Sequence, residues 1–178
     1  MSDIQPAAAK VAVSEVQPVP ATDPSTAAHA RSGLVRQIDT TGQLMTAAWR
    51  AIADAAASNT AEDRFDAANL AALRAAAAVL STRATSKPGA QLAGGSARSV
   101  WVLLPQFAPE LGEWADFFGL NFRVRTIRRG DRSIRIGERQ ADDLLRDAER
   151  FTHEVRGLLL RERALSSQAL DRHDSAAQ

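Results

Sequence analysis

The chain has 178 residues, of which 45% are hydrophobic, and a formal net charge of +1. This length suits one domain with a real core, and a net charge near zero gives the molecule no strong overall field for nucleic acid or anionic lipid. Cysteine is absent, which excludes disulfides, thiolate catalysis and cysteine-based metal sites. The sequence has neither an apolar run long enough to span a membrane nor the pattern of a signal peptide, so we expect a cytoplasmic protein without membrane contact.

The first segment, 1–33, contains four prolines among small and polar residues and shows no hydrophobic period. Such a segment buries too little surface to offset its ordering entropy, so we predict a disordered tail. The polar segment 164–178 is predicted to be disordered as well. The folded domain is therefore expected at 34–163.

Apolar residues recur every three or four positions through most of this domain, which predicts amphipathic helices. The first helix is expected to begin between Leu34 and Thr41 and to end at Ala57. Thr60 has the right chemistry to cap a second helix over 61–83. One side of that helix is rich in alanine, which allows neighbours to approach closely, so we place it at the centre of the bundle.

The prolines, glycines and hydroxyl residues of 84–96 predict a loop. A short helix is expected over 97–107, and another is expected to begin at Pro109 and to stop at Gly119. The last helix, 138–163, has the clearest periodicity of the chain.

The segment 121–136 leaves two alternatives open. Apolar residues alternate with arginines on both sides of Gly130, which is typical of a β-hairpin. A fraying helix end followed by a basic loop fits the same residues. The alternating apolar positions are Phe122, Val124, Ile134 and Ile136. The predicted fold class is all-α, a bundle of four or five helices with this hairpin or loop before the last helix.

From Arg123 to Arg139 there are seven arginines and two acidic residues, which gives a local charge of +5. Arginine forks on such a segment could grip the phosphates of RNA or of a nucleotide. The plainer interpretation is a solvated loop whose charges pair with Asp142, Asp143 and Asp147 at the start of the last helix. The candidate nucleic-acid-binding residues are Arg123, Arg125, Arg128, Arg129, Arg132, Arg135 and Arg139.

Arg146 and His153 are seven residues apart on the last helix, so they lie within about 20° of each other and nearly opposite its apolar stripe. An exposed His could take the 2′-hydroxyl proton of RNA while an Arg stabilises the phosphorane, without a metal. Seven residues rise about 10.5 Å, so the pair would have to form between two copies across a two-fold axis. The plainer interpretation pairs Arg146 with Asp142 or Asp143 and leaves His153 solvated.

Metal and cofactor sites are not expected. The three histidines, His29, His153 and His173, share no ligand spacing. Gly94-Gly95 is not followed by Lys-Ser or Lys-Thr, which excludes a phosphate-binding P-loop.

Four short segments together suggest a family. They are 69–80 (NLAALRAAAAVL), 99–105 (SVWVLLP), 108–114 (APELGEW) and 141–149 (ADDLLRDAE). In order and spacing they resemble a group of actinobacterial HEPN domains, the higher-eukaryote and prokaryote nucleotide-binding fold. The resemblance extends over residues 40–160.

This resemblance implies a HEPN-like helical bundle, often paired with a second copy through the last helices. Many HEPN proteins are RNases that use an Arg, a polar residue beside it and a His a few positions further on. Arg146, Asp147 and His153 fit that pattern, with six residues between the Arg and the His. Other members lack activity and serve as partners of other proteins.

Two functions are therefore predicted. The first is a non-catalytic HEPN-like binding or assembly module, a homodimer that contacts RNA, a nucleotide or an unidentified protein partner, with the Arg-rich segment as its nucleic-acid surface. The alternative is a metal-independent endoribonuclease that acts across a dimer interface. Its candidate catalytic residues are Arg146, Asp147 and His153.

Overall fold

The structure is a computed structural model that describes residues 24–84, 97–131 and 133–176. These residues form five α-helices and one short 3-10 helix, and no strand occurs among them. The all-α prediction is therefore confirmed. The helices are α1 (Pro24–Ala57), α2 (Ala61–Ala84), α3 (Ala97–Phe107), α4 (Gly112–Gly130) and α5 (Glu138–Ala176), with the 3-10 helix η1 at Pro109–Leu111.

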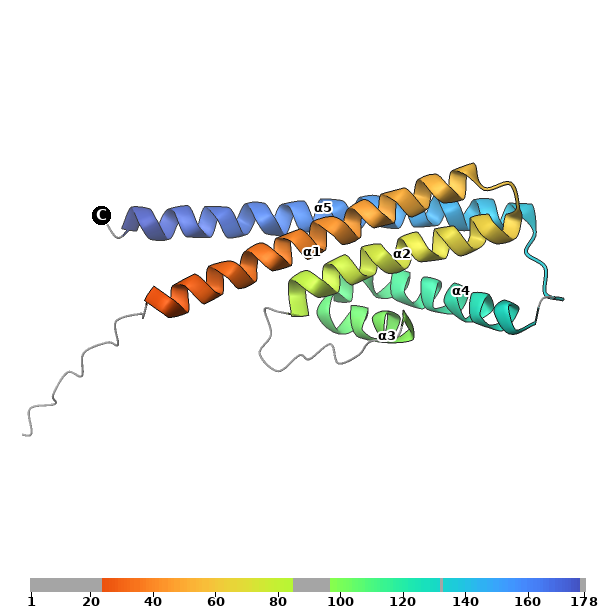
Figure 1. The fold of residues 1–178 in the computed structure, drawn as a ribbon, viewed down its shortest axis with the longest axis horizontal. Coiled ribbons are helices and arrows are strands. Elements are labelled where there is room, and N and C mark those ends of the chain that lie inside the picture. Colours follow the sequence, from red (N-terminus) through yellow and green to blue (C-terminus); the bar gives the residue numbers. More distant parts are fainter. Residues whose placement is uncertain (1–23, 85–96, 132, 177–178) are drawn as a thin grey trace, which may run out of the picture.

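Helix α2 lies at the centre of the bundle, between α1 on one side and α3 with α4 on the other, while α5 runs along it (Figure 1). Because alanine side chains are short, the neighbouring helices can approach the α2 backbone closely. The central position predicted for this helix is confirmed. The alanines of α2 that are completely buried are Ala68, Ala71, Ala72, Ala75, Ala76 and Ala78.

The large core side chains gather where α3, α4 and α5 meet. The Phe118 ring centroid lies 5.5 Å from that of Trp101, 5.8 Å from that of Trp114 and 5.3 Å from that of Phe151. Phe118 and Phe151 are completely buried. This aromatic cluster fixes α4 against α5, because rings at such separations add specific contacts to their buried area.

Local capping signals were predicted correctly. Helix α1 ends at Ala57, and Thr60 caps α2, since the backbone N–H of Asp63 donates to Thr60 Oγ1 over 3.1 Å. Thr60 in turn donates its hydroxyl to the Asp63 carboxylate over 2.8 Å. The short helix predicted over 97–107 has the predicted bounds.

Both end helices are longer than predicted. Helix α1 begins at Pro24, inside the expected N-terminal tail, and α5 continues to Ala176, through most of the expected C-terminal one. Pro24 fits the first helical turn, where no N–H is needed, and the extension of α5 is rich in good helix formers. Among the described residues, no helix has the length and apolar character needed to cross a membrane. The remainder of the predicted tails and the predicted loop lie outside the described residues, at 1–23, 85–96 and 177–178.

The predicted stop at Gly119 and the hairpin alternative for 121–136 are both wrong. Helix α4 passes through Gly119 and ends at Gly130, and a short connection leads to α5. One mid-helix glycine costs only about 1 kcal/mol. Burial of Phe118 and packing of Phe122 on either side of Gly119 outweigh that cost. The other alternative, a helix end followed by a basic loop, is correct.

Candidate functional site

The arginines at the C-terminal half of α4 converge on one carboxylate of α2. An Nη atom of Arg128 lies 2.7 Å from Asp66 Oδ2, Arg125 Nε lies 3.4 Å from Oδ1, and an Nη atom of Arg129 lies 3.5 Å from Oδ2. The side chains of Arg125 and Arg128 are only 13% and 14% exposed, whereas that of Arg129 is 61% exposed. We call these four residues the Asp66 cluster.

The Asp66 cluster carries more positive than negative charge. Three guanidinium groups face one carboxylate, which leaves a surplus of two charges. Burial lowers the pKa of Arg125, and the like charge of Arg129 lowers it further. Asp66 Oδ1 and the Nε atoms of Arg125 and Arg128 are buried without a hydrogen-bond partner in the described part of the chain. The surplus charge is therefore only partly compensated within the fold.

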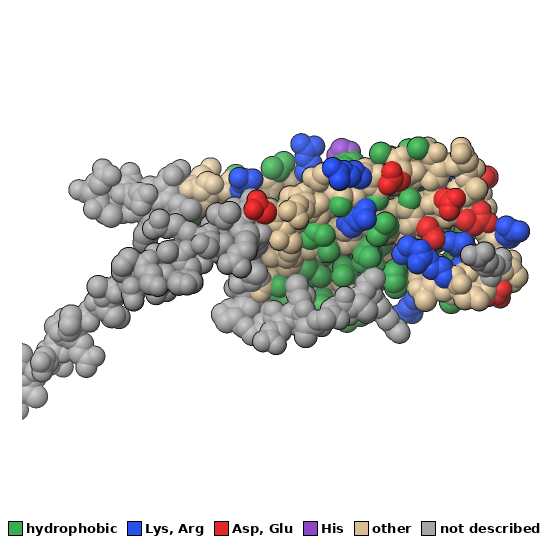
Figure 2. Space-filling view, in the orientation of Figure 1, with side chains coloured by type: hydrophobic (Ala, Val, Ile, Leu, Met, Phe, Trp, Pro, Cys, Tyr) green, Lys and Arg blue, Asp and Glu red, His purple; other side chains and the backbone are tan. Residues whose placement is uncertain are grey.

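The remaining candidate arginines do not join this cluster. Arg123 and Arg139 are exposed and form no ion pair with any described residue, and Arg135, 83% exposed, approaches Glu62 to 3.5 Å. Arg132 lies outside the described residues. Figure 2 shows basic and acidic side chains next to one another over the half of this face that holds the C-terminal end of α4 and the first turns of α5.

The acidic residues at the start of α5 have other partners than the Arg-rich segment. Asp142 lies 2.9 Å from Arg64 of α2, while Asp143 pairs with Arg146. Asp147 pairs with Arg150 on the same helix. The plainer interpretation of the Arg-rich segment therefore named the wrong acids: the arginines of α4 pair across to α2.

Arg146 and His153 both point outward from α5, as their angular position predicts. Arg146 pairs with Asp143, and its Nε donates to the backbone carbonyl of Asp142 over 3.3 Å. Asp147 is engaged by Arg150. Within one chain the three candidate catalytic residues therefore do not converge, and the plainer pairing of Arg146 with Asp143 is the one observed.

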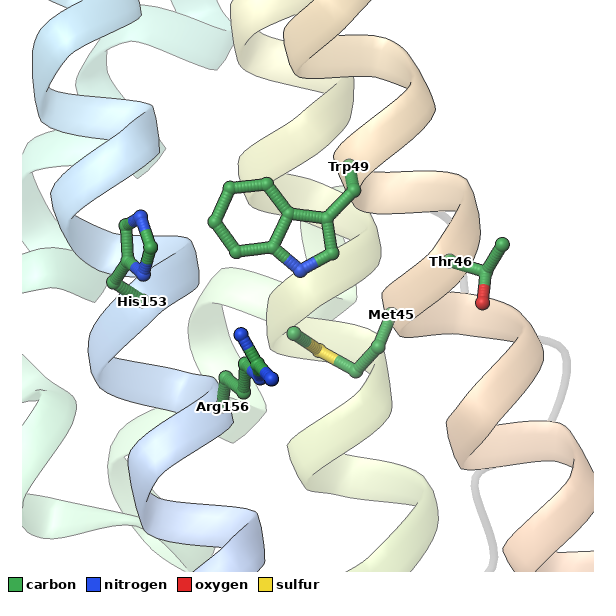
Figure 3. A pocket seen from close by; sticks show the side chains of 5 residues that line it. All are labelled: Met45, Thr46, Trp49, His153 and Arg156. Atoms are coloured by element: carbon green, nitrogen blue, oxygen red, sulfur yellow. The ribbon is translucent and has the colours of Figure 1, made fainter.

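His153 lies on the rim of an open groove of about 530 Å³ between α1 and α5 (Figure 3). The indole of Trp49 reaches across from α1, and its ring centroid lies 4.6 Å from that of the imidazole at an interplanar angle of 67°. The side chain of Met45 extends toward Arg156, whereas Thr46 points away from them. The lining combines an aromatic ring and two basic side chains and contains no acid.

Sequence reasoning missed Asp66 and the groove. Glu62 and Asp66 are four residues apart and therefore share one face of α2. This spacing could have indicated an acidic face that packs against a basic helix. Which helix would pack against that face depends on tertiary packing. No group of three or more His, Asp or Glu side chains that could hold a metal ion occurs in the described ranges.

Comparison with known proteins identifies a family. The model of a HEPN domain family matches residues 55–156, which is more than half of the chain. The matched range runs from the end of α1 into α5 and includes the Asp66 cluster and His153. No curated protein and no solved structure matches the chain.

Proposed function

We propose, from the premise that this chain belongs to the HEPN domain family, that it is a non-catalytic binding and assembly module whose α4 arginines contact the phosphates of RNA or a nucleotide. It acts as a homodimer, and its partners include nucleic acid. The convergence of three arginines on Asp66 carries this proposal.

The surplus charge of the Asp66 cluster calls for a second anion. Several positive charges that lie close together and are partly shielded from water are unfavourable unless negative charges or hydrogen-bond acceptors compensate them. The C-terminal end of α4 supplies a partial charge of about −0.5, which offsets about a quarter of the surplus. A phosphate supplies the remaining charge and several acceptor oxygens for guanidinium forks.

The exposed arginines provide the outer part of this surface. Arg129 is 61% exposed at the edge of the Asp66 cluster, and Arg135, which is 83% exposed, lies beside Glu62, one turn before Asp66 on α2. Arg125 and Arg128 are held in place by Asp66 from below. A phosphate bound at this edge thus meets exposed guanidinium groups, with the charges of Arg125 and Arg128 behind them. This arrangement favours contacts to the nucleic-acid backbone and gives little sequence preference.

Fluorescence anisotropy of a labelled single-stranded RNA tests the proposal. We expect the double variant Arg129→Ala/Arg135→Ala to bind at least about tenfold more weakly at low salt and to show a shallower salt dependence, because each lost phosphate contact removes part of the counterion release. The double variant Arg50→Ala/Arg163→Ala is the matched control, since both residues are exposed, unpaired in the described structure, and remove the same charge.

Equal weakening by both double variants would show that net charge, not the Asp66 cluster, governs binding. Competition separates the two phosphate sources: displacement of RNA by a mononucleotide at comparable concentration indicates a nucleotide site. A mononucleotide that competes no better than inorganic phosphate indicates contacts along an RNA backbone.

A second candidate is a metal-independent endoribonuclease, and one observation favours it. The imidazole of His153 is open to solvent in a groove that also presents Arg156, so it could accept a 2′-hydroxyl proton. Arg146 of a second copy would then stabilise the phosphorane. The test is cleavage of mixed RNA in EDTA by the wild type and by His153→Ala. Wild-type cleavage that the substitution abolishes supports the enzyme, and uncut RNA contradicts it.

A further inference from the structure

A row of exposed apolar side chains runs along α4. Leu120 and Ile127 are 61% and 60% exposed, Phe117 is 36% exposed, and Val124 between them is partly buried against the core. Their spacing of three, four and three residues places them on one side of the helix, which is the pattern of a helix–helix seam. We call these four residues the α4 seam.

Helix α3 widens this apolar surface. Trp101 of α3 packs against Gly119 of α4, where an added Cβ would lie 3.6 Å from the Trp101 Cβ. The two helices run in opposite directions (Figure 1). In two antiparallel helices, the residues that directly follow the contact positions lie on the same side of the pair. Val102 follows Trp101 and Leu120 follows Gly119, so both lie on that side. Val102 is 64% exposed, so it extends the α4 seam sideways.

Charged residues flank the α4 seam in a self-complementary order. Asp116 and Arg123 are seven residues apart, so they lie within about 20° of each other along the same edge of the seam. Both are exposed, and neither forms an ion pair with a described residue. A parallel pair of such helices would place like charges together, whereas an antiparallel pair places the acid of one beside the base of the other.

The distances along the helix fit an antiparallel pair centred on Leu120. Asp116 lies about 6 Å before Leu120 and Arg123 about 4.5 Å after it, so in two antiparallel copies they come within about 1.5 Å of the same level. Phe117 of one copy meets Val124 of the other in the same way. Leu120 then packs against its own counterpart on the two-fold axis, as an isologous interface requires.

We infer that the α4 seam is the surface through which two copies of this chain pair, with their α4 helices antiparallel. This inference deepens the assembly part of the proposed function and rests on it. Helices α1 and α4 lie on opposite sides of α2 (Figure 1), so a dimer formed through α4 does not join the groove of His153 to a second Arg146. The inferred dimer is therefore a binding assembly and does not build the composite RNase site.

Sedimentation of the full chain, without RNA, tests the surface. We expect a dimer for the wild type between about 1 and about 200 µM and a monomer for Leu120→Lys, whose charge falls at the centre of the apolar contact. Leu165→Lys on α5 is the matched control, because Leu165 is 63% exposed and the same charge is introduced. Both sites are on the surface, so circular dichroism should show unchanged helix content.

Charge reversal tests the direction of pairing. Asp116→Arg and Arg123→Asp should each weaken the dimer about tenfold or more, since each places like charges opposite one another. The double reversal Asp116→Arg/Arg123→Asp should restore dimerisation to within about threefold of the wild type. No partner other than an antiparallel second copy predicts this rescue.

Three results would overturn the inference: a monomeric wild type across the whole range, a dimer that survives Leu120→Lys, or a dimer lost in Leu165→Lys instead. RNA binding is measured separately on Leu120→Lys. Retained binding by a monomer supports both the α4 seam and the phosphate surface. A wild-type dimer that fails to bind RNA contradicts the phosphate surface while leaving the seam supported.

Discussion

An Nη atom of Arg128 on α4 lies 2.7 Å from Oδ2 of Asp66 on α2. This ion pair joins the basic helix to the centre of the bundle, and the same carboxylate also faces Arg125 and Arg129. Asp66 is thus both a structural link between two helices and the internal competitor of any anion that binds there.

Replacing Asp66 by Asn separates these two roles. We expect the free energy of unfolding to fall by about 1–3 kcal/mol, because partly buried guanidiniums lose their charged acceptor. We also expect RNA affinity to rise several-fold, since a phosphate then meets three arginines without competition. Urea unfolding measures the first effect and fluorescence anisotropy the second. The control is Asp54→Asn at an exposed position, whose free energy of unfolding should lie within about 0.5 kcal/mol of that of the wild type. Weaker RNA binding by Asp66→Asn would contradict this role.

Phe118 is expected to be a major contributor to stability. It is completely buried and touches Trp101, Trp114 and Phe151, so truncation leaves a cavity that the surrounding rings cannot fill. Phe118→Ala should lower the free energy of unfolding by about 3–5 kcal/mol. Leu165→Ala, at an exposed position, should change the free energy of unfolding by no more than about 0.5 kcal/mol. Similar denaturation midpoints for the two variants would mean that this aromatic cluster is not the core.

Arg83 should make stability depend on pH. Its Nη2 lies 2.5 Å from Glu110 Oε1 and 2.5 Å from Glu162 Oε1, and its hydrogen bond holds the pKa of Glu110 below the ordinary 4.5. A carboxyl group whose pKa is lower in the folded state stabilises the fold above its unfolded pKa. That contribution is lost as the pH falls through the folded value.

Arg83→Gln should therefore be less stable than the wild type at pH 7, and the difference should shrink as the pH falls below about 4. Urea midpoints of both proteins at pH 7 and at about pH 3 measure this change. A difference of the same size at both pH values would mean that Arg83 acts through packing and not through the Glu110 carboxylate.

Thr60→Ala removes the side-chain acceptor of the Asp63 N–H at the start of α2. We expect a loss of about 1 kcal/mol in the free energy of unfolding, the usual cost of an N-cap threonine. Thr46→Ala in the middle of α1 is the control, and it should be neutral or slightly stabilising because alanine is the better helix former there. Equal effects of both substitutions in thermal unfolding would argue against the cap.

Helix boundaries that depend only on neighbouring residues were predicted correctly from the sequence. The cap at Thr60 and the end of α1 at Ala57 depend on a few neighbouring residues. The continuation of α4 through Gly119 depends instead on the packing of Phe118 against α3 and α5, which a single sequence does not show. For the same reason the hairpin pattern of 121–136 was misleading: Phe122 and Val124 both belong to a helix and are partly buried against the core.

The candidate site was predictable in part. The arginine surplus of α4 and the outward direction of His153 follow from counting charges and from helical geometry. The partner of those arginines, Asp66, belongs to a helix more than fifty residues earlier in the chain. The groove of Trp49 and His153 likewise requires α1 beside α5. Both depend on the arrangement of helices that are distant in sequence.

The salt dependence of RNA binding tests most directly whether α4 holds phosphates. With about three phosphate contacts to a single strand, the logarithm of the association constant should fall against the logarithm of salt concentration with a slope of about −2. The slope should become shallower in Arg129→Ala/Arg135→Ala and stay unchanged in Arg50→Ala/Arg163→Ala. No RNA binding at low salt, or a slope that Arg129→Ala/Arg135→Ala leaves unaltered, would contradict a phosphate surface at the C-terminal end of α4.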